Sequence, residues 1–199
     1  MRSLALAVLA GVMAVAGGAR AENAFDYCLL CHGANANGNY GIRAPKISGM
    51  EPWYLKRQLE QFAAGIRGTP ADDASGHEMR TVGMRLEDEG ALAAAVAFIG
   101  TLDSKAPVPT VSGDVAHGKA LYAACVSCHG AKGEGNAQLQ APALAARSDW
   151  YLVTQLRNYK LGLRGADPRD TYGAQMRAIV AALPDDQAVV DVVAYINSL

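Results

Sequence analysis

The chain has few cysteines and none to spare for a structural disulfide. Its four Cys, in 199 residues, all fall in two short motifs. Basic residues are not in excess either, because 18 Lys and Arg stand against 19 Asp and Glu, for a formal net charge of −1. Nucleic-acid binding needs a basic surface, so the charge balance predicts no nucleic-acid partner.

Long hydrophobic runs are missing after residue 21, so no later segment predicts a membrane-spanning helix. The first 21 residues differ: Met1 and Arg2 give a positive start, residues 4–16 are apolar, and Ala19-Arg20-Ala21 matches a cleavage signal. This pattern is typical of a secretory signal peptide. An uncleaved anchor is the alternative, and it would leave the protein associated with the membrane.

Two copies of one motif stand out in the remaining sequence. Residues 28–33 read CLLCHG and residues 125–130 read CVSCHG. C-x-x-C-H is the attachment signature of c-type haem: two thiols bind the two vinyl groups of the porphyrin, and the adjacent His binds the iron. The predicted attachment residues are Cys28, Cys31, Cys125 and Cys128, with His32 and His129 as iron ligands.

The alternatives for a C-x-x-C pair are a redox dithiol, a disulfide or half of a zinc site. A dithiol does not need the following His, and a zinc site would need both pairs to converge. The sequence therefore predicts two covalently attached haem c groups, and an exported protein with such groups belongs in a bacterial periplasm.

The motifs are part of a longer repeat with an offset of 97 residues. Trp53-Tyr54-Leu55 matches residues 150–152, and the G-x-R-G of residues 65–68 matches that of residues 162–165. A repeat of this length is a whole domain. Residues 103–112 contain two prolines, which oppose a helix. The predicted organisation is a signal peptide at 1–21, domain one at 22–102, a linker at 103–112 and domain two at 113–199.

Each domain is predicted to be helical. Helices are expected at 51–63 and 149–161, where apolar residues recur at helical spacing, and at 88–101 and 185–198, where the first turn is acidic. A further helix is expected at 114–125, and Asp149 is expected to cap the helix that begins there. No stretch alternates with period two for long enough to predict a sheet, so the fold class is all-α.

The sixth iron ligand separates an electron carrier from a catalytic haem. Met79 follows His32 by 47 residues, and Met176 follows His129 by the same 47 residues. Because both Met occupy equivalent positions, they are the predicted sixth ligands, in loops before the last helix of each domain. Met84, Met50 and His77 have no equivalent in the second copy and are not predicted as ligands.

Other residues have two interpretations at this point. The carbonyls of Pro45 and Pro142, each 13 residues after a motif His, are either acceptors for the ring N–H of that His or parts of plain turns. Arg67 and Arg164 are either partners of haem propionates or solvated charges, and the solvated interpretation is preferred. The same choice between propionate partner and aromatic core applies to Trp53, Tyr54, Trp150 and Tyr151.

With these motifs the chain resembles the two-haem cytochrome c₄ family, from about residue 21 to the end. The resemblance rests on the paired C-x-x-C-H motifs, the PKISG of residues 45–49, the W-Y-L-x-x-Q-L helices, the G-x-R-G loops and the Met-Arg pairs. It implies two class I cytochrome c domains that face each other, His/Met ligation of both irons, and electron transfer with respiratory partners.

Three functions remain open. The first is a periplasmic carrier that passes single electrons between redox proteins such as a terminal oxidase, a cytochrome complex or a dehydrogenase. The second is a haem-bearing electron-acceptor subunit of a periplasmic or membrane dehydrogenase. The third is a haem enzyme, which would need an open iron position, and the paired Met residues argue against it.

Overall fold

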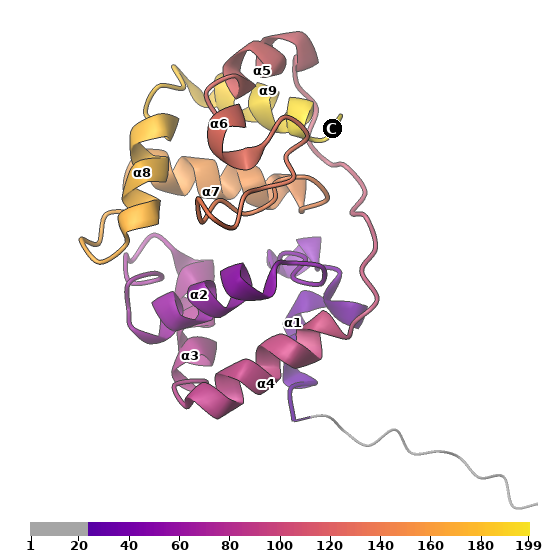
Figure 1. The fold of residues 1–199 in the computed structure, drawn as a ribbon, viewed down its shortest axis with the longest axis vertical. Coiled ribbons are helices and arrows are strands. Elements are labelled where there is room, and N and C mark those ends of the chain that lie inside the picture. Colours follow the sequence, from indigo (N-terminus) through magenta and orange to yellow (C-terminus); the bar gives the residue numbers. More distant parts are fainter. Residues whose placement is uncertain (1–23) are drawn as a thin grey trace, which may run out of the picture.

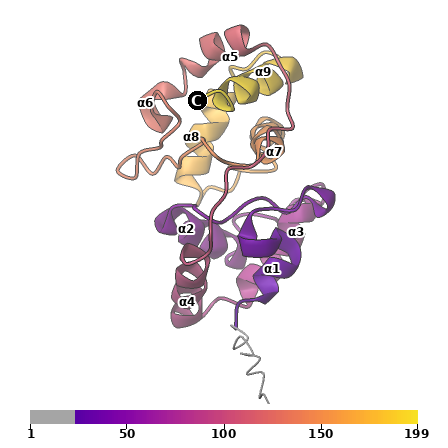
Figure 2. The ribbon, with the colours of Figure 1, turned by 90° about the vertical axis from the view of Figure 1, so that its right-hand side faces the viewer.

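The computed structural model describes residues 24–199, so the predicted signal peptide at 1–21 lies outside the described residues. Figures 1 and 2 show two groups of helices stacked on each other and joined by an extended segment. Within the described part no strand is formed, and β-pairing is limited to the isolated bridges Asn39–Ala44 and Asn136–Ala141. The prediction of an all-α protein is confirmed.

Domain one contains helices α1 to α4, and domain two contains α5 to α9. The helices of domain one are α1 (Tyr27–His32), α2 (Pro52–Ala63), α3 (Ala74–Met84) and α4 (Glu89–Gly100), with the short 3₁₀ turns Ala34–Ala36 and Tyr40–Ile42. Those of domain two are α5 (Val115–Tyr122), α6 (Val126–His129), α7 (Asp149–Leu161), α8 (Thr171–Val180) and α9 (Asp186–Ile196).

The predicted helices are present, with boundaries that differ by a few residues. The apolar faces of α2 and α7 are buried, as the spacing of Leu55 and Leu59 indicated, and these two residues pack with Ile99 of α4 in the core of domain one. The core of domain two brings together Val153 of α7 and Val193 of α9. Asp88 and Asp185 begin the last helices, because each carboxylate accepts a hydrogen bond from a backbone N–H of the first turn.

Helices α3 and α8 were not predicted, and the placement of Met79 and Met176 in loops was wrong. Both Met lie inside these helices, which begin at the capping residues Asp73 and Asp170. The buried residues are Gly76 and Gly83 in α3, and Gly173 and Val180 in α8. The apolar residues of their inner faces, Met79 and Val82 in α3 and Met176 and Ile179 in α8, line the cavities.

The segment between α4 and α5 runs without helix along one side of both domains (Figures 1 and 2). Asn37 bonds to it from domain one, through the Asp103 carbonyl and the Lys105 N–H. From domain two, the buried Asp149 carboxylate accepts hydrogen bonds from Thr110 and Val111. Asp149 therefore fastens the connecting segment and is not the helix cap, since the N-cap position of α7 belongs to Ser148.

Among residues 24–199, no helix combines the length and the apolar character needed to cross a bilayer.

Candidate functional site

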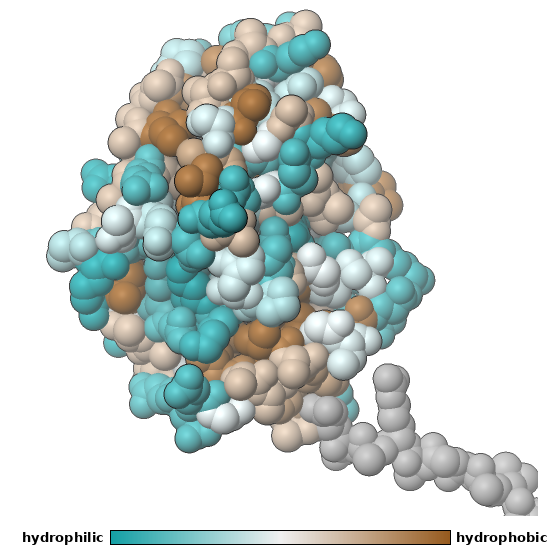
Figure 3. Space-filling view, in the orientation of Figure 1, coloured by the Kyte–Doolittle hydropathy of each residue, from teal (hydrophilic) through white to brown (hydrophobic). Residues whose placement is uncertain are grey.

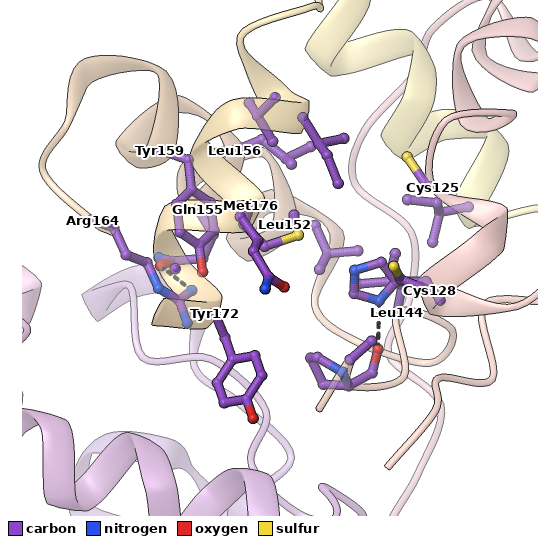
Figure 4. A pocket seen from close by; sticks show the side chains of 18 of the residues that line it. Cys125, Cys128, Leu144, Leu152, Gln155, Leu156, Tyr159, Arg164, Tyr172 and Met176 are labelled. Atoms are coloured by element: carbon purple, nitrogen blue, oxygen red, sulfur yellow. Dashed lines mark hydrogen bonds between the residues drawn. The ribbon is translucent and has the colours of Figure 1, made fainter. Parts of the chain in front are cut away.

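Each pair of motif cysteines borders its own cavity. Cys28 and Cys31 line a cavity of about 400 Å³ in domain one, and Cys125 and Cys128 line one of about 430 Å³ in domain two (Figure 4). Because the pairs do not converge, they cannot share a zinc ion. Burial raises the pKa of the Cys125 thiol to about 11 and also raises that of Cys28, the opposite of the lowered pKa that a redox dithiol uses.

The motif histidines are buried, and their rings are fixed from one side. Nδ1 of His32 lies 2.6 Å from the Pro45 carbonyl, and Nδ1 of His129 lies 2.8 Å from the Pro142 carbonyl. A carbonyl only accepts, so Nδ1 carries the proton and the lone pair is on Nε2. Burial lowers the pKa of both rings, although the carbonyl bond acts in the other direction.

Nε2 of His129 is buried without a hydrogen-bond partner. A neutral imidazole with Nδ1 engaged and Nε2 left free in a cavity has the chemistry of a metal ligand. The donor set therefore fits a c-type haem: two thiols, one oriented imidazole and an enclosed space beside them.

The two equivalent methionines border the same cavities. Met79 lines the cavity with His32, and Met176 lines the cavity with His129. Figure 4 shows Met176 reaching into the cavity from α8, on the side away from Cys125 and Cys128. Met84 is 50% exposed, whereas Met50 borders both cavities.

The G-x-R-G loops hold the Met-bearing helices in place. Gly68 has φ +79°, and a Cβ there would lie 2.2 Å from the carbonyl oxygen of Gly76 in α3. A Cβ on Gly165 would likewise lie 2.3 Å from the carbonyl oxygen of Gly173 in α8. Only glycine permits this approach of two backbones, which sets α3 and α8 against the loops and directs the intervening arginines into the interface.

Arg67 and Arg164 are buried between the domains, so their description as solvated charges was wrong. Each donates to the glutamine of its own domain, Arg67 to Gln58 at 2.6 Å and Arg164 to Gln155 at 2.9 Å. Each also reaches across, Arg67 to Gln155 and Arg164 to Gln58, both at 2.7 Å. The acceptors of these hydrogen bonds are neutral amide and tyrosine oxygens. Nε of both arginines is buried without a partner.

Tyrosines on the paired helices take part in the same network. Arg67 donates to the hydroxyl of Tyr151 at 3.0 Å, and Arg164 donates to that of Tyr54 at 3.1 Å. Trp150 instead packs edge-on against Tyr40 of domain one. The tyrosines are thus interface residues with a satisfied polar end, and their side chains line both cavities.

A second cluster joins the domains and was not found from the sequence. Glu51 forms an ion pair of 3.0 Å with Arg147 and accepts a hydrogen bond of 2.7 Å from the Ala143 N–H. Ser148 accepts a bond of 3.1 Å from the Lys46 N–H. The available signal was the set of positions where the two copies of the repeat differ, because Glu51 matches Ser148 and Lys46 matches Ala143 at the 97-residue offset.

These features define a class: a helical protein with two domains, each with a C-x-x-C-H motif for one covalent haem and a cavity beside it. Comparison with known proteins agrees. The family model described as cytochrome c matches residues 18–103 and again residues 115–199.

Relatives and solved structures extend the comparison. A thiosulfate dehydrogenase electron acceptor of Stutzerimonas stutzeri is 32% identical over 80% of this chain and 73% of its own length. Cytochrome c₄ of Acidithiobacillus ferrooxidans superposes with a TM-score of 0.67 and 25% identity, over 86% of this chain and 98% of that one. The thiosulfate dehydrogenase structure from Marichromatium purpuratum gives a TM-score of 0.67 and 32% identity over 85% of this chain, which spans only 35% of that longer one.

The chain belongs to the cytochrome c family, as a tandem protein of the two-haem cytochrome c₄ type. It is a dihaem electron carrier with two covalently bound haem c groups. The predictions of family, cofactor and carrier function are thereby confirmed.

Proposed function

We propose that each haem is held by four residues of its own domain: two cysteines bind the porphyrin, and a His and a Met bind the iron. For haem one these are Cys28, Cys31, His32 and Met79, and for haem two they are Cys125, Cys128, His129 and Met176. The observation that carries this proposal is the convergence of each set on one cavity. The unpartnered Nε2 of His129 supports it further.

The haem supplies the one-electron couple, and the residues of the chain keep its surroundings constant during transfer. The Pro45 and Pro142 carbonyls fix the histidine rings, so the donor strength of each imidazole is set by the fold. Thioether sulfur is a neutral, soft ligand that raises the reduction potential. A filled sixth position leaves no site for oxygen or peroxide, which supports a carrier over an enzyme.

Arg67 and Arg164 are placed to balance charge at the inner edges of the haems. Two guanidinium groups in a buried interface, with only neutral hydrogen-bond partners in the network described above, need a negative charge nearby. We infer that haem propionates supply it, because the arginine Nε atoms remain free to donate.

Electrons are proposed to cross between the haems through this same interface. Tyr54 and Gln58 of domain one line both cavities, as do Tyr151 and Gln155 of domain two. A single layer of side chains therefore separates the two sites. One haem accepts an electron from a donor, and the other passes it to an acceptor, without diffusion of the protein between the two steps.

The proposed donor is a periplasmic thiosulfate-oxidising dehydrogenase, and the proposed acceptor is a terminal oxidase or another cytochrome. The relatives named as electron acceptors of thiosulfate dehydrogenase support the donor. On the face shown in Figure 3, apolar groups occur in small clusters separated by hydrophilic ones. Small apolar patches suit transient docking, whereas a permanent subunit interface is larger and more hydrophobic.

The donor is tested by mixing the oxidised holoprotein with a purified thiosulfate dehydrogenase and thiosulfate in a stopped-flow spectrophotometer. Both haems should become reduced, and the same mixture without thiosulfate is the control. If ascorbate reduces both haems but the dehydrogenase does not, the donor proposal is wrong and the carrier function stands. Size-exclusion chromatography of the mixture separates transient docking from a stable subunit, which would co-elute with the dehydrogenase.

A further inference from the structure

In each domain, the carbonyl that orients the motif histidine belongs to a peptide unit whose N–H is hydrogen-bonded by the other domain. The Pro142 carbonyl fixes His129, and the N–H of the following residue, Ala143, donates to Glu51 of domain one at 2.7 Å. In the mirrored arrangement the Pro45 carbonyl fixes His32, and the N–H of Lys46 donates to Ser148 of domain two. Glu51 and Ser148 are equivalent in the repeat and stand at the N-cap positions of α2 and α7.

The mirrored positions differ in charge. On the side of haem two the acceptor is a carboxylate, and on the side of haem one it is a neutral hydroxyl. The Glu51 carboxylate also pairs with Arg147, whose side chain is 8% exposed against 25% for that of Glu51. Arg147 further donates to the carbonyl of Gly49 at 3.0 Å, so the guanidinium is held against domain one at a second point.

We propose that Glu51 is a positioning residue for haem two: across the domain interface its carboxylate polarises the peptide that orients His129 and thereby lowers the reduction potential of that haem. This inference rests on the proposed role of His129 as an iron ligand. An anionic acceptor on the Ala143 N–H increases the electron density on the Pro142 carbonyl, because the two groups share one peptide unit.

The stronger carbonyl acceptor draws the Nδ1 proton of His129 and makes Nε2 a better donor to iron. A better donor stabilises ferric iron, and so does the negative charge itself. Both effects lower the potential of haem two relative to a neutral residue at position 51. Ser148 supplies a hydrogen bond but no charge, so the potential of haem one is not lowered by a negative charge at this position. A duplicated domain thus acquires two unequal haems through a residue of the opposite domain.

The test uses the full holoprotein with Glu51→Gln, which keeps the side-chain oxygen for the Ala143 N–H and removes the charge. Spectroelectrochemical titration should show a raised potential for haem two. The electron-exchange equilibrium between the haems should shift at least about threefold, where tenfold corresponds to about 59 mV for a one-electron couple. The NMR signal of His129 Nδ1–H should move, while that of His32 should stay in place.

Glu60→Gln is the matched control. It makes the same change on the same helix, in an exposed pair with Lys56, and should leave both potentials unchanged. Ser148→Ala should alter haem one alone. If Glu51→Gln does not yield holoprotein, Glu51→Ser copies the residue found at the mirrored position and should raise the same potential.

Two results overturn the inference: an unchanged haem two potential with an unchanged His129 signal, or equal shifts at both haems. The unmutated protein separates these from failure of the proposed ligation. Two low-spin haems with the spectral signature of His and Met ligands in the unmutated protein mean that the ligation holds whatever Glu51 does, and a spectrum without that signature means that the ligation itself is wrong.

Discussion

Arg67 of domain one donates a hydrogen bond of 2.7 Å to Gln155 of domain two, and Arg164 returns the same bond of 2.7 Å to Gln58. Each glutamine oxygen therefore serves both arginines. The two domains are joined by a symmetric set of charge-assisted bonds at the place where their haem cavities meet, so the interface is part of the functional site.

Replacement of Arg67 by Gln should weaken the joined structure by about 1–3 kcal/mol. The change removes the arginine that donates to the Tyr151 hydroxyl and one of the two donors to each glutamine oxygen, and an unsatisfied buried group carries a cost of this size. Urea unfolding of the holoprotein measures the difference. Arg157→Gln removes an exposed pair with Asp186 and should cost at most about 1 kcal/mol. Equal stabilities for the two variants would show that the network does not hold the domains.

Covalent attachment should be complete and separable by domain. Mass spectrometry of protein matured in a periplasm should show two haems that survive denaturation, because both C-x-x-C-H motifs face cavities. Cys125→Ala removes one of the two thioether links in domain two and should weaken attachment there alone. A mass with one haem or none for the unmutated protein would contradict the assignment.

The sixth ligands are tested by Met79→Ala and Met176→Ala. Each change should lower the potential of its own haem and open that iron to carbon monoxide, since the soft neutral ligand is lost. Absorption spectra before and after carbon monoxide measure both effects. Met84→Ala is the control, because Met84 is exposed outside the cavities, and its spectra should match those of the unmutated protein. Ready binding of carbon monoxide without any mutation would favour an enzyme.

Asp149 should make stability depend on pH in the acid range. Burial opposes its ionisation, but hydrogen bonds from Thr110, Val111 and Trp150 hold the pKa of Asp149 below its ordinary value. A depressed pKa in the folded protein stabilises the fold above the unfolded value, about 3.9, and this contribution disappears as the pH falls through the folded value.

The variant Asp149→Asn should therefore be less stable at pH 7 by about 1.5–3 kcal/mol, the contribution of a hydrogen bond to a charged group. The difference from the unmutated protein should shrink as the pH falls below about 4. Thermal unfolding across this range measures both. A difference that stays constant from pH 7 to pH 3 would mean that the carboxylate charge is not what fastens the connecting segment.

The sequence by itself determined the chemistry that depends on short spacing. The C-x-x-C-H motifs predict covalent haem because five consecutive residues carry the whole attachment chemistry. The helices at α2, α4, α7 and α9 follow from apolar residues at helical spacing. The pairing of Met79 with Met176 needed only the repeat, since the two residues occupy equivalent positions in the duplicated domains.

The tertiary structure decided what depends on contacts between residues about a hundred positions apart. In the sequence, Arg67 and Arg164 look like ordinary charged loop residues. They are buried only because α2 and α7 face each other across the interface. That Met79 and Met176 lie inside helices α3 and α8 and face the cavities is likewise seen only in the structure. The bond from Ala143 to Glu51 likewise depends on how the domains dock, a geometry that no local spacing records.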